Sequence, residues 1–163
     1  MQRLGQHEVL ACFPLRLELH WSGQELLRLD LSFCRQEPAP EPELSSQGAE
    51  LRLFLKGYLQ GQAQEPPWIR LAWAGLSSFQ ALVLSRLQAQ VPQGEQISYQ
   101  GLAELCGRAK AARAVGRVMA KNPWPLLIPC HRVLGKGGKL GGFSSGLELK
   151  RFLLDLEGIA YRG

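Results

Sequence analysis

The hydrophobic residues of this chain change their spacing once, near its middle, and this change limits the fold more than any other feature. In the first half, leucines alternate with polar residues over 15–20 and again over 27–33, a period of two that is typical of strands with one buried face. In the second half, apolar residues recur every three or four positions, which indicates amphipathic helices. The sequence therefore predicts an α+β protein, with a β-rich N-terminal domain over 1–75 and a mostly helical C-terminal domain over 76–163.

Breaker residues divide the first domain into elements. Ser22-Gly23 predicts the turn between the two strands, and the Pro-, Glu- and Ser-rich residues 36–47 predict a loop. Helical spacing follows over 51–59, and a short strand is expected at 68–73. We expect the domain boundary between residues 70 and 78.

Capping signatures mark two helices of the second domain. Ser77-x-x-Gln80 precedes one apolar stripe, and Ser145-x-x-Glu148 precedes another, which ends before Gly158. In a capping box the first side chain accepts a hydrogen bond from the backbone of the fourth residue. We therefore expect Ser77 and Ser145 each to cap a helix.

Two short helices are expected, one over 99–105 capped by Ser98 and one over 111–121, joined by a tight turn that contains Gly107. This layout predicts a winged helix-turn-helix. The second helix carries a basic stripe and, beside it, a stripe of small residues: Lys110, Arg113, Arg117 and Lys121, and Ala109, Ala112, Gly116 and Ala120. Small side chains let a helix approach DNA closely, and the cations can bind phosphates. The alternative is that the small residues pack on a neighbouring helix.

Charge is distributed unevenly along the chain, whose net charge is +5. Residues 1–75 carry seven basic and nine acidic groups, whereas residues 76–163 carry twelve basic and five acidic groups. No acidic residue lies between Glu104 and Glu148, a stretch that contains eight basic residues. One sign of charge over such a length favours a polyanionic partner such as nucleic acid, and the alternative is a solvated basic face.

The sequence also disfavours several classes of protein. No apolar run reaches the ~18–20 residues of a membrane span, and no secretory signal pattern begins the chain. We therefore expect no membrane partner and a cytoplasmic protein, or a nuclear one in a eukaryote. The four cysteines form no C-x-x-C pair, which disfavours a zinc knuckle or a disulfide framework.

The segment Pro129-Cys130-His131-Arg132 is the candidate for chemistry. A thiol with a pKa near ~8.5 is only a few per cent ionised at neutral pH, and a nearby base or cation raises that fraction. Because neighbours in an extended chain point to opposite sides, His131 reaches Cys130 only through a turn or a water. Taken alone, a Cys-His pair is more often structural than catalytic.

The context of this pair favours catalysis, because residues 122–133 resemble the active-site segment of the O6-alkylguanine-DNA alkyltransferases, the methylated-DNA–protein-cysteine methyltransferases. Further matches at the family's spacing are Ile97-Ser98-Tyr99, Arg113-Ala114-Val115-Gly116, Phe143-Ser144-Ser145-Gly146-Leu147, Lys150 and Glu157-Gly158. The resemblance covers about residues 76–158, and the first domain matches only in its β-then-helix layout.

The resemblance implies a role for each matching residue. Cys130 matches the thiolate that accepts the alkyl group, and His131, through a water, and Glu157 match the relay that activates it. Asn122 matches an asparagine that braces the turn before the active-site strand. Tyr99 matches a tyrosine that helps to rotate the nucleotide out, and Arg113 matches an intercalating arginine. Groups that match the lining of the guanine pocket are those of Val133, Phe143 and Ser144.

The implied function is direct-reversal DNA repair. The alkyl group of O6-alkylguanine, and of O4-alkylthymine, in double-stranded DNA would pass irreversibly to Cys130, once per molecule, with no cofactor. The protein would bind the minor groove as a monomer and flip the damaged base out of the duplex, where its O6 is otherwise inaccessible. One alternative is a protein that recognises alkylated bases without transfer, but such proteins typically replace the cysteine. The other is a winged-helix regulator, which would leave Cys130 and its relay unexplained.

Two residues depart from the family's pattern, and one property of the family stays open. Phe143 stands where tyrosine is common and Ser145 where glycine is usual, so we expect altered acceptance of larger alkyl groups. Some family members bind zinc in the first domain. The candidate zinc ligands in this chain are Cys12, Cys34, His7 and His20. Their spacing matches no recognisable ligand motif, so we expect no metal.

Overall fold

The computed structural model describes residues 6–36 and 43–163, and it divides into two compact units, Met1–Ala72 and Trp73–Gly163. The loop predicted at 36–47 falls partly outside the described residues. Among the described residues, no helix is long and apolar enough to cross a membrane.

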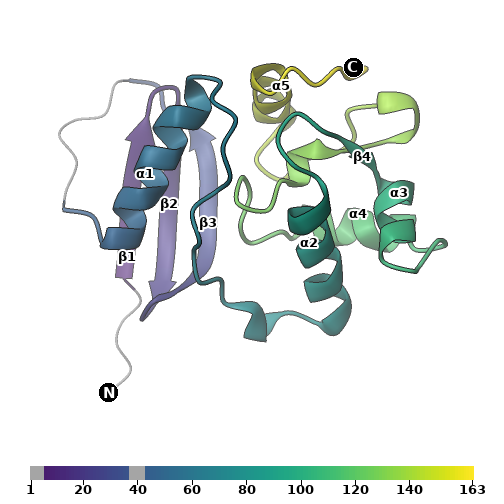
Figure 1. Cartoon of the computed structure of the whole chain (residues 1–163), viewed down its shortest axis with the longest axis horizontal. Coiled ribbons are helices and arrows are strands. Elements are labelled where there is room, and N and C mark those ends of the chain that lie inside the picture. Colours follow the sequence, from purple (N-terminus) through teal and green to yellow (C-terminus); the bar gives the residue numbers. More distant parts are fainter. Residues whose placement is uncertain (1–5, 37–42) are drawn as a thin grey trace. The chain divides into compact units, whose positions relative to one another are not determined.

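The N-terminal unit is a three-stranded antiparallel sheet with one helix. Its strands are β1 (Gln6–Cys12), β2 (Leu15–Ser22) and β3 (Glu25–Phe33), in the order β1-β2-β3, and α1 (Ser46–Leu59) lies across one face of the sheet (Figure 1). The leucines of β2 are buried at every second position, as the alternating pattern predicts. The two predicted strands are therefore confirmed, with the turn at residues 22–25 between them.

The sequence analysis missed strand β1. Its inward-facing position Glu8 is only 6% exposed, so a charge interrupts the apolar alternation. The carboxylate is satisfied because it accepts hydrogen bonds from Trp21 Nε1 at 3.1 Å and from Ser45 N at 2.7 Å. A buried carboxylate with such partners is tolerated, but the hydrophobic alternation of this segment gives no sign that Glu8 is buried.

Two other expectations for the N-terminal unit were wrong in detail. The helix predicted over 51–59 begins five residues earlier, because Ser45 caps it and accepts from Gly48 N at 3.1 Å. The strand expected at 68–73 is only an isolated parallel bridge between Leu26 and Leu71.

The C-terminal unit is mostly helical. Its regular elements are α2 (Ser78–Gln90), β4 (Ile97–Ser98), α3 (Tyr99–Leu105), α4 (Ala112–Ala120), β5 (Val133–Leu134) and α5 (Leu147–Leu156). Helices α2, α3 and α4 pack against one another, and β4 pairs with β5 in parallel. Helix α5 packs against the 3-10 turn Cys130–Arg132. The two short strands therefore place the start of α3 next to the segment that follows Cys130.

Capping chemistry explains most helix starts of this unit, with one correction. Ser77 and Gln80 form the predicted capping box, with both hydrogen bonds present at 2.9 and 3.2 Å. Ser98 caps α3 by accepting from Gly101 N. The capping box predicted at Ser145 is wrong: Gly146, at a φ of +97°, is the N-cap of α5 and makes no side-chain bond. A turn closed by Gly146 N and Phe143 O places Ser145 before the helix.

Candidate active site

Cys130 lies at the start of a short 3-10 turn, after the buried apolar segment 124–129. The Cys130 amide donates to Ile128 O at 2.8 Å, and the Arg132 amide donates to Pro129 O at 3.0 Å. The turn directs the Cys130 side chain into a pocket, although the cysteine itself is only 3% exposed. A turn at this point is what a Cys-His pair needs if both side chains are to serve one site.

The pocket has a volume of about 380 Å³, within the range of small-molecule sites. The residues that line it come from α3, α4, the turn at Cys130 and the end of the glycine-rich loop, which covers 135–144: Tyr99, Gly116, Met119, Ala120, Cys130, Gly142, Phe143 and Ser144. Gly141 has a φ of +67°, and a Cβ atom there would lie 2.9 Å from Tyr99 Oη. The loop therefore approaches the tyrosine closely because it has no side chain at that position.

The resting state of Cys130 is a protonated thiol. Burial raises the pKa of Cys130, and the side chain of Asn122, the charge of Lys150 and the backbone amides of Cys130 and His131 act in the opposite direction. Burial also raises the pKa of Tyr99, and the nearby Cys130 adds to this effect. Both groups are therefore proton donors in the free protein, and a thiolate requires a base.

His131 is the base closest to Cys130 in the chain, and its side chain is completely buried. Its Nε2 lies 2.7 Å from Glu157 Oε1. Burial lowers the pKa of His131, despite the opposing effect of Glu157. With Nε2 donating to the carboxylate, the neutral ring presents Nδ1 as an acceptor. This Nδ1 is buried and has no hydrogen-bond partner among the described residues.

Glu157 is a buried carboxylate that stays ionised. Burial alone would raise its pKa, but hydrogen bonds from His131 and Arg132 hold the pKa of Glu157 far below its usual range. Arg132 Nε donates to Oε2 at 2.8 Å and Arg132 Nη2 to Oε1 at 3.0 Å, so the pair is bidentate. Gly94 N also donates to Oε2, at 3.1 Å. The charge therefore rests on Glu157 and Arg132, and His131 is neutral.

The sequence assigned no role to two residues that position the site. Arg132, which lies in the segment 129–132, orients Glu157 and also donates to Val91 O at 2.8 Å. Lys150 is fully buried, and its Nζ donates to Val133 O at 2.8 Å and to Gly142 O at 3.1 Å. Burial lowers the pKa of Lys150 to about 8. Lys150 thus ties the strand after Cys130 to the loop that lines the pocket.

Asn122 closes the turn that leads from α4 to Cys130. Its Nδ2 donates to Ile128 O at 2.9 Å, and its Oδ1 accepts from Trp124 N at 3.0 Å. The turn contains Leu126 at a φ of +74°, which is uncommon for a residue other than glycine. The two side-chain bonds hold this strained backbone in place.

The structure brings most of the predicted site residues together. Cys130, Tyr99, Phe143, Ser144 and Gly116 line one pocket, and His131 and Glu157 lie in the buried network beside it. Val133 is not one of the lining residues; it is fully buried, and its carbonyl oxygen accepts from Lys150.

Helix α4 presents its basic residues to solvent. Arg113 and Arg117 are exposed, whereas Val115, Val118 and Met119 face the core. Lys110 is also exposed, but it lies in the turn before α4 and not on the helix as predicted. Of the small residues, Ala112 is half-buried and Gly116 faces the ring of Tyr99, where a Cβ atom would sit in ordinary contact at 3.9 Å. Of the small-residue stripe, Gly116 and Ala120 line the pocket.

Comparison with known proteins identifies the second unit. Residues 78–159 match the model of the 6-O-methylguanine DNA methyltransferase family, DNA binding domain. A methylated-DNA–protein-cysteine methyltransferase of Haemophilus influenzae is 36% identical over 151 residues, which are 90% of this chain and 82% of that protein. The human protein of the same name is 54% identical over 81 residues, 50% of this chain and 39% of the human protein.

A solved structure extends the similarity to both units. The structure described as Mycobacterium tuberculosis OGT in complex with DNA superposes with a TM-score of 0.75 at 32% identity, covering 93% of this chain and 91% of that one. The family match spans α2 to α5 and therefore includes Cys130, its buried network and the pocket. This chain belongs to the O6-methylguanine-DNA methyltransferase family.

Proposed function

We propose that this protein repairs DNA directly, by irreversible transfer of the alkyl group of O6-alkylguanine, and of O4-alkylthymine, to Cys130. The observation that carries the proposal is a nearly buried cysteine that lines a pocket of about 380 Å³ beside a buried His131–Glu157 pair. The names of the relatives at 36–54% identity support the same chemistry. Transfer leaves a stable thioether, so each molecule acts once.

The thiol loses its proton to His131. Because Nε2 of His131 donates to Glu157, the acceptor Nδ1 takes the Cys130 proton through a water. Glu157, held by Arg132, then stabilises the imidazolium that forms. The unpartnered Nδ1 and the depressed pKa of Glu157 support this order of events.

The displacement itself is a single in-line step. The Cys130 thiolate forms an S–C bond to the alkyl carbon as the C–O6 bond breaks, and the electron pair of that bond remains on guanine. A hydrogen bond from the Tyr99 hydroxyl to the base stabilises the leaving group. His131 finally gives up this proton to solvent, and guanine takes up one proton from solvent, so protons balance over the reaction. No cofactor takes part.

We further propose that α3 and α4 form a winged helix-turn-helix that enters the minor groove of double-stranded DNA. Small residues Ala112 and Gly116 let α4 approach the groove, and Lys110 and Arg117 bind phosphates. Arg113 fills the space that the flipped nucleotide leaves. The solvent exposure of Arg113 and Arg117 on α4, and of Lys110 in the turn before it, supports the assignment. The protein acts as a monomer.

Duplex DNA with radiolabelled O6-methylguanine tests the transfer. We expect one label per protein on Cys130, none in Cys130→Ser, and full labelling in Cys106→Ser, a matched substitution of another buried cysteine. Tight binding of alkylated DNA without label would instead identify a recognition protein. Equal affinity for alkylated and unmodified DNA, without label, would identify a winged-helix regulator.

Phe143 and Ser145 differ from the tyrosine and glycine that are usual in the family, and the same assay tests what this difference does. We propose that they limit transfer of bulky groups, because Phe143 lines the pocket and Ser145 lies in the adjoining turn. Ser145→Gly should raise the rate for O6-benzylguanine relative to O6-methylguanine. An unchanged ratio of the two rates would contradict the proposal.

A further inference from the structure

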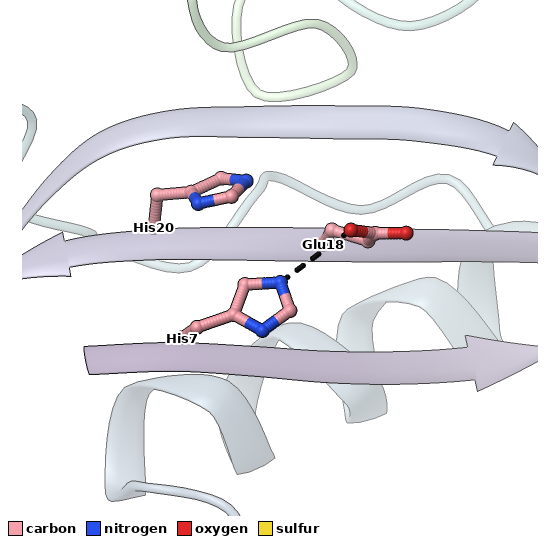
Figure 2. A group of neighbouring side chains, drawn as sticks. All are labelled: His7, Glu18 and His20. Atoms are coloured by element: carbon pink, nitrogen blue, oxygen red, sulfur yellow. Dashed lines mark ion pairs between the residues drawn. The ribbon is translucent and has the colours of Figure 1, made fainter. Parts of the chain in front are cut away.

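Three residues of metal-binding types meet on the N-terminal sheet. His7 on β1 pairs across the strands with His20 on β2, and Glu18 stands two residues before His20, so all three share one face. Figure 2 shows their side chains together in front of β1 and β2, with a helix behind the strands. One candidate ligand atom from each residue lies within 4.8 Å of the other two.

The distances in this cluster are close to those of a metal site. His7 Nε2 lies 3.4 Å from Glu18 Oε2. Two ligands of a tetrahedral zinc ion, each bound at ~2.0–2.1 Å, lie about 3.4 Å apart. The rings of His7 and His20 are 4.9 Å apart between centroids, and both side chains are more than one-third exposed. The three side chains are therefore near, but not at, the spacing of a three-ligand set.

Neighbouring groups orient these ligands. Asp30 Oδ2 lies 3.0 Å from His20 Nε2, so in the tautomer that donates to Asp30 the other ring nitrogen, Nδ1, is the acceptor. Arg16 Nη2 contacts Glu18 Oε1 at 2.9 Å, which keeps Oε2 directed at His7. A carboxylate behind a ligating histidine is the usual support of a metal site, because it fixes the tautomer and the ring orientation.

The cysteines of this unit lie elsewhere. Cys12 is buried and pairs with Leu15 at the far end of β1, five positions from His7. Cys34 Sγ contacts the carbonyl oxygen of Gln36. The set Cys12, Cys34, His7 and His20 considered from the sequence is therefore not brought together, and Glu18 takes the place of a thiolate.

We propose that His7, Glu18 and His20 bind a divalent transition-metal ion of the zinc class, with water completing the coordination. Nitrogen and carboxylate ligands in this ratio suit Zn²⁺ and Co²⁺ better than Mg²⁺ or Ca²⁺, which prefer oxygen alone. The ion cross-links β1 and β2 and takes no part in alkyl transfer.

Titration of the full chain with Co²⁺, followed by its visible d–d absorption, tests the site. We expect one ion per chain with nitrogen and oxygen ligation, displaced by Zn²⁺ but not by Mg²⁺. His7→Asn, His20→Asn and Glu18→Gln should each lower the affinity at least tenfold. Glu25→Gln, a carboxylate on the same sheet outside the cluster, is the matched control and should bind as the unmodified protein does.

The supporting shell provides a second readout. Asp30→Asn should weaken Co²⁺ binding by about 10- to 100-fold, because it removes the partner of His20. In the absence of metal, all variants should unfold in urea cooperatively and with midpoints shifted by no more than surface substitutions cause, which separates lost binding from lost folding. The proposal is overturned if no ion binds at millimolar Co²⁺, or if the bound ion shows a thiolate charge-transfer band that survives His7→Asn.

Discussion

The two units of this protein each contain a histidine and an arginine that share one carboxylate. In the N-terminal sheet, His20 and Arg28 contact Asp30 at 3.0 and 2.7 Å. In the C-terminal unit, His131 and Arg132 contact Glu157 at 2.7 and 2.8 Å. The Asp30 side chain is 39% exposed, whereas that of Glu157 is fully buried.

Burial is therefore the difference between the two triads. Burial alone would raise the pKa of Asp30, but bonds from Arg28 and His20 outweigh it and lower that pKa. The same opposition at Glu157 shifts the pKa much further, because the partners act without solvent between them. Similar contact distances thus yield a surface ion pair in one unit and a fixed charge that orients a base in the other.

Removal of the carboxylate should show the largest difference. Glu157→Gln leaves Arg132 buried without its counter-charge, and we expect it to lower the free energy of unfolding by about 3–5 kcal/mol and alkyl transfer by at least ~100-fold. Asp30→Asn should cost less than ~1 kcal/mol and leave transfer unchanged. Urea unfolding and single-turnover labelling measure both effects, and similar losses in the two variants would contradict the comparison.

Removal of the arginine should give a smaller difference. Arg132→Met keeps the volume of the side chain but removes the bidentate partner of the buried Glu157 carboxylate, so we expect a loss of about 2–3 kcal/mol. Arg28→Met, at an exposed position, should cost less than ~1 kcal/mol. The unfolding free energies in urea compare the two directly, and equal costs would mean that burial of the ion pair has little effect.

The two triads should also respond in different pH windows. Burial lowers the folded-state pKa of His131, so below the ~6.5 of an unfolded histidine the folded protein binds fewer protons than the unfolded chain. Its contribution to stability is complete above about pH 6.5 and is lost as the pH falls, with a slope of up to ~1.4 kcal/mol per pH unit. The contribution of Asp30 is lost only below about pH 4, since its pKa is lowered from an already acidic value.

Unfolding free energies measured from pH 7.5 to 4.5 test these windows. His131→Asn should flatten the decline between pH 6.5 and 4.5, whereas Asp30→Asn should retain it. A decline that persists in His131→Asn would assign the titration to other groups.

Salt should produce the smallest effect. Solvent-exposed pairs are screened within about 3 Å at 1 M salt, whereas buried pairs are screened much less. We expect the cost of Asp30→Asn to approach zero in 1 M NaCl, while the cost of Glu157→Gln changes little. A salt-sensitive cost at Glu157 would indicate that water reaches this pair.

Local rules predicted much of the fold. The alternation in β2, the capping box at Ser77 and the cap at Ser98 depend on neighbouring residues, and all were confirmed. In β3 the strand was confirmed, but Leu27 and Phe33 of the predicted buried face are exposed. Strand β1 was missed because its buried Glu8 is stabilised by Trp21 and Ser45, which are distant in sequence. The cap at Ser145 was wrong because the preceding turn shifts the helix start by one residue.

Some residues of the candidate site could likewise be predicted from the local sequence, and others could not. The motif around Cys130 was visible in the sequence, but the contact of Arg132 with Val91 spans 41 residues and has no local signal. Lys150 lies among the apolar positions of α5, and a lysine is ordinarily expected to be exposed to solvent. Its burial depends on two carbonyl oxygens that only the tertiary fold places around it.

The burial of Cys130 also bears on how long an unused molecule remains competent. A protein that acts once holds no second nucleophile, so every oxidised or chemically blocked Cys130 is a repair lost. Oxidants attack accessible thiolates first, and Cys130 is 3% exposed with a raised pKa, whereas Cys34 is more accessible. The same burial that makes a base necessary for transfer therefore preserves the store of working protein between lesions.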